Sequence, residues 1–264
     1  MVKQEVISLY KNRGETPLEC LERFRKENPD YKDEKMTYAG RLDPLAEGLL
    51  LVLVGEECKN KEKYLEFDKE YELEILFGFS TDTYDVLGKV TKAESTFVIP
   101  EKSGIQNLDF RLHGNDTTKE LISSFVGKFS QKYPSFSSKT VKGIALFNHA
   151  KNGTLSEEEI PSKDVEVKNI EITDERIISK NDLENFVKES IAIVSGDFRQ
   201  EEIFKNWKEV FGKIEQEEFK IISIKVLCTS GTYMRSLANS IGEKIGVPAL
   251  ALNIKRISVG KYNI

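Results

Sequence analysis

The sequence has little of the chemistry that metal centres and disulfide scaffolds need. Its 264 residues include three cysteines and two histidines. The cysteines form no C-x-x-C pair, which disfavours a zinc site or a disulfide framework, so we expect small buried side chains at Cys20, Cys58 and Cys228. The histidines, His113 and His149, lie 36 positions apart in unlike contexts, which is weak material for a catalytic pair or a metal site. We expect both on the surface or in loops.

Long apolar runs are also missing. The longest runs, such as Leu49 to Val54, are far shorter than the roughly 20 apolar residues that a membrane span requires. The N-terminus, Met1 to Glu5, does not contain the apolar core of a signal peptide. We therefore expect a cytoplasmic protein without a membrane partner. A hydrophobic content of 39% is sufficient for the core of one large or two modest domains.

Negative charge is unevenly distributed. The net charge is −5, but residues 156–220 alone carry 18 acidic and 10 basic side chains. The rest of the chain therefore carries 26 acidic and 29 basic residues. A nucleic-acid partner is compatible with this balance if the basic part faces the phosphates. The alternative is that all these charges form solvated faces with no partner.

Apolar periodicity predicts alternating strands and helices. A strand over 6–10 is followed by a helix that begins with Thr16 as N-cap, Pro17 at the first position and Glu19 at the third. Residues 69–78 alternate, which predicts a strand with Tyr71 facing inward. The other expected elements are helices over 119–125, 181–194, 200–211 and 233–245, and strands over 49–54, 219–228 and 254–262.

Asp43 has the most informative setting in the chain. It lies between a glycine turn at Gly40 and a proline at position 44, directly before the aliphatic run that begins at Leu49. A carboxylate at the edge of a buried strand is either a cap or turn residue or a catalytic group. Its own position does not distinguish these two interpretations.

Residues 130–153 mix basic and aromatic side chains. Four lysines are interleaved with Tyr133, Phe136 and Phe147 and with several hydroxyl groups. Stacking aromatic rings beside cations are typical of contact with single-stranded or looped RNA. An ordinary loop over the core is the alternative.

Several separate motifs together resemble the TruB family of tRNA pseudouridine synthases. The resemblance covers most of the chain outside the acidic tract. The motifs are Lys11-Asn12-Arg13-Gly14, Gly40-Arg41-Leu42-Asp43-Pro44-Leu45-Ala46-Glu47-Gly48, Asp68-Lys69-Glu70-Tyr71, Thr81-Asp82-Thr83-x-Asp85-x-x-Gly88, Pro134-Ser135-Phe136-Ser137-Ser138, and Gly231-Thr232-Tyr233-Met234-Arg235.

This resemblance implies an α+β pseudouridine synthase fold, with a mixed, mostly antiparallel central sheet, flanking helices and a catalytic cleft. It implies one catalytic domain over 1–264, with an RNA-contacting insertion at about 128–153 and an extra acidic insertion at about 155–218. No C-terminal PUA domain is expected. We hypothesise that the acidic insertion points away from RNA, because its charges repel phosphates.

The implied reaction is the isomerisation of uridine-55 in the T-loop of tRNA to pseudouridine. The reaction involves no redox change and no hydrolysis, so no metal or small-molecule cofactor is expected. Asp43 matches the catalytic aspartate, Arg235 its arginine partner, Tyr71 the tyrosine that stacks on the base and helps to remove the C5 proton, and Tyr233 a second active-site tyrosine. Whether Asp43 attacks the ribose, attacks the base or drives base elimination stays open. The expected RNA-contacting residues are Tyr38, Lys11, Arg41, Lys132, Lys139 and Lys142.

The chain departs from the family pattern at three positions. Tyr38 stands where the family usually has the histidine that helps base flipping. Asn12 replaces the usual proline, and Thr140 a usual lysine. These departures affect the expected substrate more than the expected reaction. The alternatives are therefore a synthase that acts on another RNA, such as ribosomal RNA, and a tRNA-binding folding chaperone.

Overall fold

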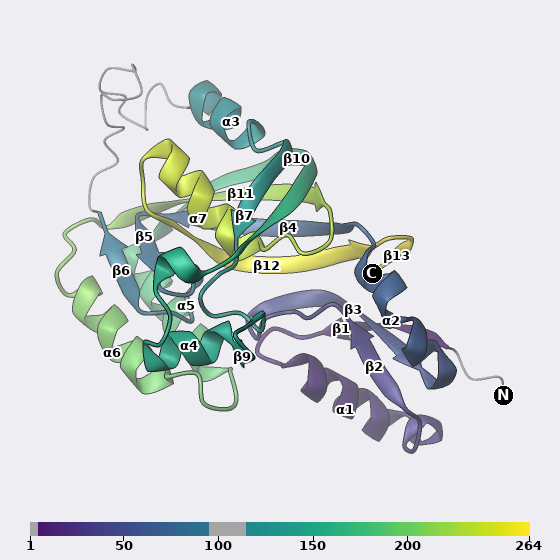
Figure 1. Cartoon of the computed structure of the whole chain (residues 1–264). Coiled ribbons are helices and arrows are strands. Elements are labelled where there is room, and N and C mark those ends of the chain that lie inside the picture. Colours follow the sequence, from purple (N-terminus) through teal and green to yellow (C-terminus); the bar gives the residue numbers. More distant parts are fainter. Residues whose placement is uncertain (1–4, 95–114) are drawn as a thin grey trace.

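The central element is one large mixed sheet. The computed structural model describes residues 5–94 and 115–264 (Figure 1). Within them, nine strands form a sheet in the order β1-β3-β12-β4-β11-β10-β7, with β2 added to β3 and β13 added to β12. The strands of this sheet are β1 (Val6–Lys11), β2 (Met36–Ala39), β3 (Ala46–Val54), β4 (Lys69–Phe77), β7 (Gly127–Lys132), β10 (Ser162–Ser179), β11 (Glu218–Cys228), β12 (Ala249–Val259) and β13 (Tyr262–Asn263).

Helices and two small hairpins surround this sheet. The hairpins are β5 (Phe79–Thr81) with β6 (Val90–Ala93), and β8 (Thr140–Val141) with β9 (Ile144–Ala145). The α-helices are α1 (Pro17–Glu27), α2 (Lys61–Leu65), α3 (Asn115–Ser123), α4 (Leu146–Asn152), α5 (Lys180–Ala192), α6 (Gln200–Phe211) and α7 (Met234–Ile245). Short 3-10 helices cover Pro29–Tyr31, Gly55–Asn60 and Glu157–Glu159. The architecture confirms the α+β class that the sequence predicted, with a mixed, mostly antiparallel sheet.

The two halves of the sheet join through one short parallel pairing. All neighbouring strands are antiparallel except β3 and β12, which pair in parallel from Ala46–Ile254 to Gly48–Arg256. Gly48 has φ +102°, and a Cβ at this position would lie 2.3 Å from the carbonyl oxygen of Arg256. Only glycine permits this approach. The loop that contains Asp43 ends where this junction begins.

The faces of β4 carry different helices. Its alternate residues Tyr71, Leu73 and Ile75 are buried on one face together with apolar residues of α7, as the period-two pattern predicted. Leu76 points to the opposite face and packs in a cluster with residues of α5 and α6. The sheet is therefore covered on both sides, by α7 on one face and by the pair α5 and α6 on the other.

The first helix has the predicted start. The hydroxyl of Thr16 accepts a hydrogen bond from the Glu19 amide at 3.2 Å, and the Glu19 carboxylate accepts one from the Thr16 amide at 2.7 Å. This reciprocal capping box satisfies two amides that the helix itself leaves unpaired. Cys20 and Leu21 then pack against β1 and β3.

The region that we expected to be a separate acidic insertion is part of the domain core. Its first half forms β10, which pairs with both β7 and β11. Its second half forms α5 and α6, which bury Leu183, Ile203 and Trp207 against the sheet. The acidic residues occupy the outer sides of these elements. β10 and the apolar sides of α5 and α6 therefore belong to the sheet and its core. The interpretation of residues 155–218 as an insertion relative to the family stays a prediction.

The positions of the cysteines and histidines differ in part from what we expected. Cys20 and Cys228 are buried, whereas Cys58 is only half-buried. His149 was expected on the surface or in a loop, but it is buried in α4, with its ring nitrogens near the Thr154 hydroxyl and the Val141 carbonyl. His113 lies outside the described residues. Among the described helices, none is long and apolar enough to cross a membrane.

Candidate active site

Asp43 lies in the loop between β2 and β3. The Ala46 amide donates to the Asp43 carbonyl at 3.0 Å, and the Gly14 amide donates to the Pro44 carbonyl at 2.8 Å. Gly40 begins the loop with φ +85°, a conformation that favours glycine. The glycine and proline punctuation seen in the sequence thus produces a tight turn that presents the Asp43 side chain, which is 40% exposed.

Two buried cations hold the backbone of this loop. The Arg256 guanidinium donates to the carbonyls of Gly40, Arg41 and Leu49 at 3.2, 3.3 and 2.8 Å. Lys11 Nζ donates to the carbonyls of Pro44 at 3.2 Å and Ala46 at 2.6 Å. Both side chains are almost inaccessible to solvent. Arg256 therefore joins the start of the loop to β3, and Lys11 fixes the end of the loop.

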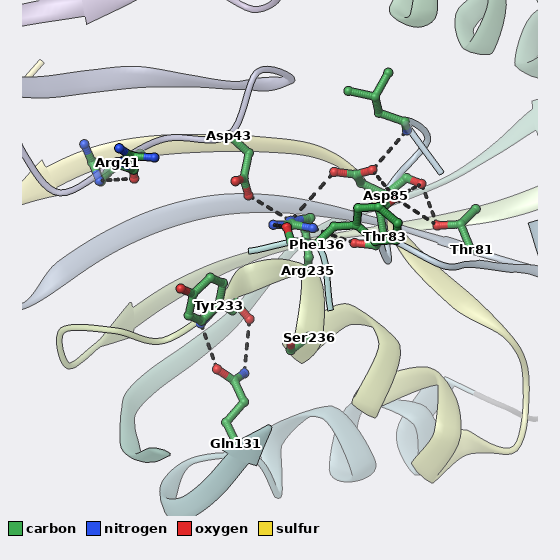
Figure 2. A network of polar contacts seen from close by, with 12 residues as sticks. Arg41, Asp43, Thr81, Thr83, Asp85, Gln131, Phe136, Tyr233, Arg235 and Ser236 are labelled. Carbon is green, nitrogen blue, oxygen red and sulfur yellow. Dashed lines mark hydrogen bonds and ion pairs between the residues drawn. The ribbon is translucent and has the colours of Figure 1, made fainter. Parts of the chain in front are cut away.

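Arg235 pairs with Asp43, as the motif match led us to expect. Its Nε donates to Asp43 Oδ2 at 2.8 Å (Figure 2). Nη1 donates to the Thr83 carbonyl at 2.8 Å, and Nη2 donates to the Phe136 carbonyl at 3.1 Å. The guanidinium, whose side chain is only 4% exposed, thus has fixed acceptors on three sides. The guanidinium forms an ion pair with Oδ2 of Asp43, which extends toward it from the loop.

A second carboxylate faces the same guanidinium. Asp85 Oδ2 lies 3.7 Å from Arg235 Nε, and Asp85 Oδ1 accepts hydrogen bonds from the Thr83 hydroxyl and the Leu87 amide at 2.6 and 3.0 Å. Burial raises the pKa of Asp85, and the nearby Arg235 charge opposes that rise. Arg235 therefore lies between a buried carboxylate and a partly exposed one (Figure 2).

Gln131 holds the backbone of Tyr233. The Gln131 side chain accepts from the Tyr233 amide at 2.8 Å and donates to the Tyr233 carbonyl at 3.1 Å. The Tyr233 ring packs edge-on against Tyr133, with centroids 5.6 Å apart. Burial and the nearby Asp43 charge raise the pKa of Tyr233. β7 thus fixes this tyrosine at the start of α7, two residues before Arg235.

Tyr71 is buried on the α7 face of β4 and belongs to the same apolar cluster as Leu42, next to Asp43 in the loop. Burial raises its pKa, and the Arg256 charge opposes that rise. The structure therefore brings all four expected catalytic residues, from three separate segments, to one region of the sheet. Their catalytic roles stay a proposal.

The expected RNA-contacting residues have unequal positions. Lys11 is completely buried and binds loop carbonyls, so its position is that of a loop anchor instead of a surface contact. Tyr38 and Arg41 line a pocket of about 380 Å³ beside the Asp43 loop, together with Arg25 and Lys61. The Lys61 ammonium lies 5.7 Å from the centre of the Tyr38 ring. This pocket offers an aromatic face and cations.

The three lysines expected in the RNA-contacting insertion are exposed. Lys139 lies over the Tyr133 ring at 5.3 Å, and Lys142 forms an exposed ion pair with Glu159. The insertion itself is compact, because β7, β8, β9 and α4 make up most of it. A cavity of about 760 Å³ lies between this insertion and the β5–β6 hairpin, and Tyr84 and Phe136 are among its lining residues.

Sequence reasoning missed three residues that shape the site: Asp85, Gln131 and Arg256. Asp85 belongs to a quoted motif, so its position beside Thr83 was available as a signal. Gln131 and Arg256 carry no local signal, because each acts on backbone that is more than 100 residues away.

Known proteins match the chain over most of its length. A family model described as "TruB family pseudouridylate synthase (N terminal domain)" matches residues 29–190. Three relatives, each named tRNA pseudouridine synthase B, come from Bacillus licheniformis, Thermosipho melanesiensis and Thermotoga maritima. They are 28%, 29% and 27% identical over 98%, 98% and 100% of this chain. The chain spans about two thirds of their length, at 66%, 64% and 65%.

Solved structures share the fold. A Cbf5-Nop10-Gar1 complex contains a chain with a TM-score of 0.55 and 19% identity, aligned over 98% of this chain and 49% of that one. An H/ACA RNP bound to a substrate RNA that contains 2'-deoxyuridine gives a TM-score of 0.52 and 18% identity, with coverages of 98% and 48%. At these identities the likeness concerns the fold alone. The family model covers more than half of the residues, so the chain belongs to the TruB family of pseudouridylate synthases.

Proposed function

We propose that the protein is a tRNA pseudouridine synthase that isomerises uridine-55 of the T-stem-loop, with Asp43 as its catalytic aspartate. The observation that carries this proposal is the ion pair between Asp43 and Arg235, which joins two family motifs 192 residues apart. A structural turn aspartate would not need a buried arginine aimed at its carboxylate. The relatives' printed name supports tRNA as the substrate class.

The reaction exchanges one bond of the uridine for another. The bond between ribose C1′ and base N1 breaks, the uracil turns, and a bond forms between C1′ and C5. The proton on C5 is lost and N1 ends protonated, so the composition of the RNA is unchanged. Asp43 reacts with the ribose or the base or drives base elimination, while Arg235 orients its carboxylate through the hydrogen bond from Nε.

The surroundings of the pair suit the other steps. Tyr71 stacks on the uracil and accepts the C5 proton, directly or through a relay. The target uridine must leave the T-loop stack before it reaches Asp43. Tyr38 and the cations of the neighbouring pocket are suited to hold bases and phosphates that this extrusion displaces. Tyr38 takes the position where the family usually has a histidine, and its ring can stack or wedge there instead.

The deciding experiment compares Asp43→Asn with Asp174→Asn, a change of an exposed carboxylate on β10. The substrate is a T-stem-loop RNA with tritium at C5 of the target uridine, and the readouts are tritium release and RNA affinity. We expect no release by Asp43→Asn, with RNA binding unchanged, and normal release by Asp174→Asn. Tritium release by Asp43→Asn at the wild-type rate would eliminate the proposed mechanism.

The alternative functions predict other outcomes. A synthase for ribosomal RNA would release tritium from a ribosomal fragment and not from the T-stem-loop. If the protein is a folding chaperone, the Asp43→Asn variant should still restore tRNA function when it is introduced into cells that lack the protein. Mapping pseudouridines in total RNA from such cells tests the position, and we expect loss at tRNA position 55 alone.

A further inference from the structure

The connection between α5 and α6 reaches the active-site side of the domain. Residues 193–199 join the helices, and Asp197 in this segment forms an exposed ion pair with Lys151 of α4. On α6, the Trp207 indole donates to the Gly88 carbonyl at 3.0 Å. The helix pair is therefore held to α4 through its connection and to the segment 82–88 through α6.

Arg199, the last residue of this connection, makes two specific contacts. Its guanidinium binds Asp82 through two hydrogen bonds, Nη1 to Oδ2 at 2.7 Å and Nη2 to Oδ1 at 3.2 Å. The same guanidinium lies over the Phe136 ring, 4.0 Å from its centre. The backbone of Arg199 has φ +62°, which is uncommon for a residue with a side chain. Both side chains of the ion pair are mostly shielded from solvent, at 18% and 26% exposed.

The two partners of Arg199 belong to the two segments that hold Arg235. Asp82 directly precedes Thr83, whose carbonyl accepts from Arg235 Nη1. Phe136 is itself the residue whose carbonyl accepts from Arg235 Nη2 (Figure 2). Only the third acceptor of Arg235, Asp43, comes from a segment that Arg199 does not contact. One side chain of the helix pair thus braces two of the three supports of the guanidinium.

We propose that Arg199 is a positioning residue that keeps Arg235 aligned with Asp43, an inference that rests on the proposed function of that pair. Arg199 holds the Asp82–Thr83 backbone by a bidentate ion pair and the Phe136 segment by ring stacking. Arginine suits both contacts, because its planar guanidinium donates two parallel hydrogen bonds and stacks on a ring. The helix pair therefore contributes to catalysis through the geometry of the site, without contact with the reacting base.

The test measures the single-turnover rate, the RNA affinity and the protection of backbone amides from hydrogen exchange in Arg199→Ala and Arg199→Lys. Arg176→Ala is the control for the loss of an ion-paired arginine, because Arg176 on β10 pairs with Glu74 of β4 at 2.9 Å. We expect Arg199→Ala to react roughly tenfold more slowly, because small misplacements of catalytic groups are costly. RNA affinity stays within twofold of wild type. Arg199→Lys recovers part of the rate, and Arg176→Ala reacts normally.

A second variant tests the route of the effect. Asp82→Asn should slow the reaction by a similar factor, and the double variant Arg199→Ala/Asp82→Asn should be no slower than the worse single variant, because the pair acts as a unit. If Arg199→Ala does not fold, Asp82→Asn and Arg199→Lys carry the test. A wild-type rate in Arg199→Ala would overturn the proposal. The proposal would also be overturned if Arg199→Ala lost RNA affinity but kept the wild-type rate. In that case the salt dependence of RNA binding should weaken by about one phosphate contact, because Arg199 would bind RNA directly.

Amide hydrogen exchange separates this proposal from the proposed function. Peptides that cover 82–85 and 133–139 should exchange faster in Arg199→Ala than in wild type and the Arg176→Ala control. If wild type forms no pseudouridine, the proposed function fails, while faster exchange still supports the bracing by Arg199. If Asp43→Asn is inactive and Arg199→Ala is as active and as protected as wild type, only the positioning role fails.

Discussion

The guanidinium of Arg235 is buried, while the carboxylate of Asp43, 2.8 Å away, is 40% exposed. The cation therefore belongs to the protein interior, whereas the anion is accessible from solvent. This asymmetry suits a nucleophile, because a buried charge orients the carboxylate without blocking its approach to substrate. Asp85, a buried carboxylate 3.7 Å from the same Nε, is a second anion that shares the charge of the guanidinium.

Arg235→Lys should keep a positive charge and lose activity. A lysine does not have the planar guanidinium group of arginine, so it cannot donate to Asp43, the Thr83 carbonyl and the Phe136 carbonyl at the same time. We expect a turnover rate lower by roughly 100-fold, with RNA affinity near wild type. Arg176→Lys, at an exposed ion pair, is the control. Near-normal turnover in Arg235→Lys would mean that charge alone suffices.

Tyr71→Phe should bind RNA and fail in turnover. The substitution keeps the ring that stacks on the base and removes the hydroxyl that is assigned to the proton transfer. Tyr64→Phe is the control, because Tyr64 is a similarly buried tyrosine whose hydroxyl binds Glu57 in another cluster. The measurement is tritium release together with RNA affinity. Turnover near the wild-type rate would exclude the proton role of the Tyr71 hydroxyl.

Lys11→Met should reveal the cost of burying an ammonium. Burial lowers the pKa of Lys11 to about 8 from 10.5, so between these values the unfolded chain binds a proton that the folded chain does not. The free energy of unfolding of wild type should therefore rise with pH relative to Lys11→Met across this window. Below about pH 8 both states of wild type are protonated, and the difference stops changing.

Urea unfolding of both proteins at pH 7.5 and 9.5 measures this effect. We expect Lys11→Met to be less stable at both pH values, because the Pro44 and Ala46 carbonyls lose their donor. The stability gap should widen at the higher pH. Lys26→Met, at an exposed lysine of α1, controls for the loss of one lysine. A gap that narrows as pH rises would contradict the burial cost.

Trp207→Ala should destabilise the whole domain, since α6 is part of its core. Trp207 is 1% exposed, stacks on Phe211 and packs against Phe79. We expect a loss of about 3–5 kcal/mol in the free energy of unfolding. Phe204→Ala, on the same helix at a ring that is 40% exposed, should cost about 1 kcal/mol or less. Equal losses in the two variants would imply that α6 packs only loosely on the sheet.

The strands and helices with a clear local signal were predicted well. The Thr16 and Glu19 capping box, the alternation around Tyr71 and the helix over 200–211 all appear in the structure. β10 was missed because it is mostly exposed and because two register shifts, at Val167–Asn169 and Ile172–Asp174, interrupt its alternation. The hydrogen bonds to β7 and β11 define this strand, and its own hydrophobic pattern does not predict it.

The sequence by itself determined the family motifs, the tight turn around Asp43 and the local caps, because these depend on residues near each other in the chain. Only the tertiary structure decided that Lys11 is a buried anchor, that Asp85 faces Arg235 and that Arg199 braces its supports. Those relations join segments far apart in the chain, and their geometry depends on how the sheet and helices pack. The same charged residues that suggested a separate acidic insertion proved to be the outer sides of helices whose apolar sides complete the core.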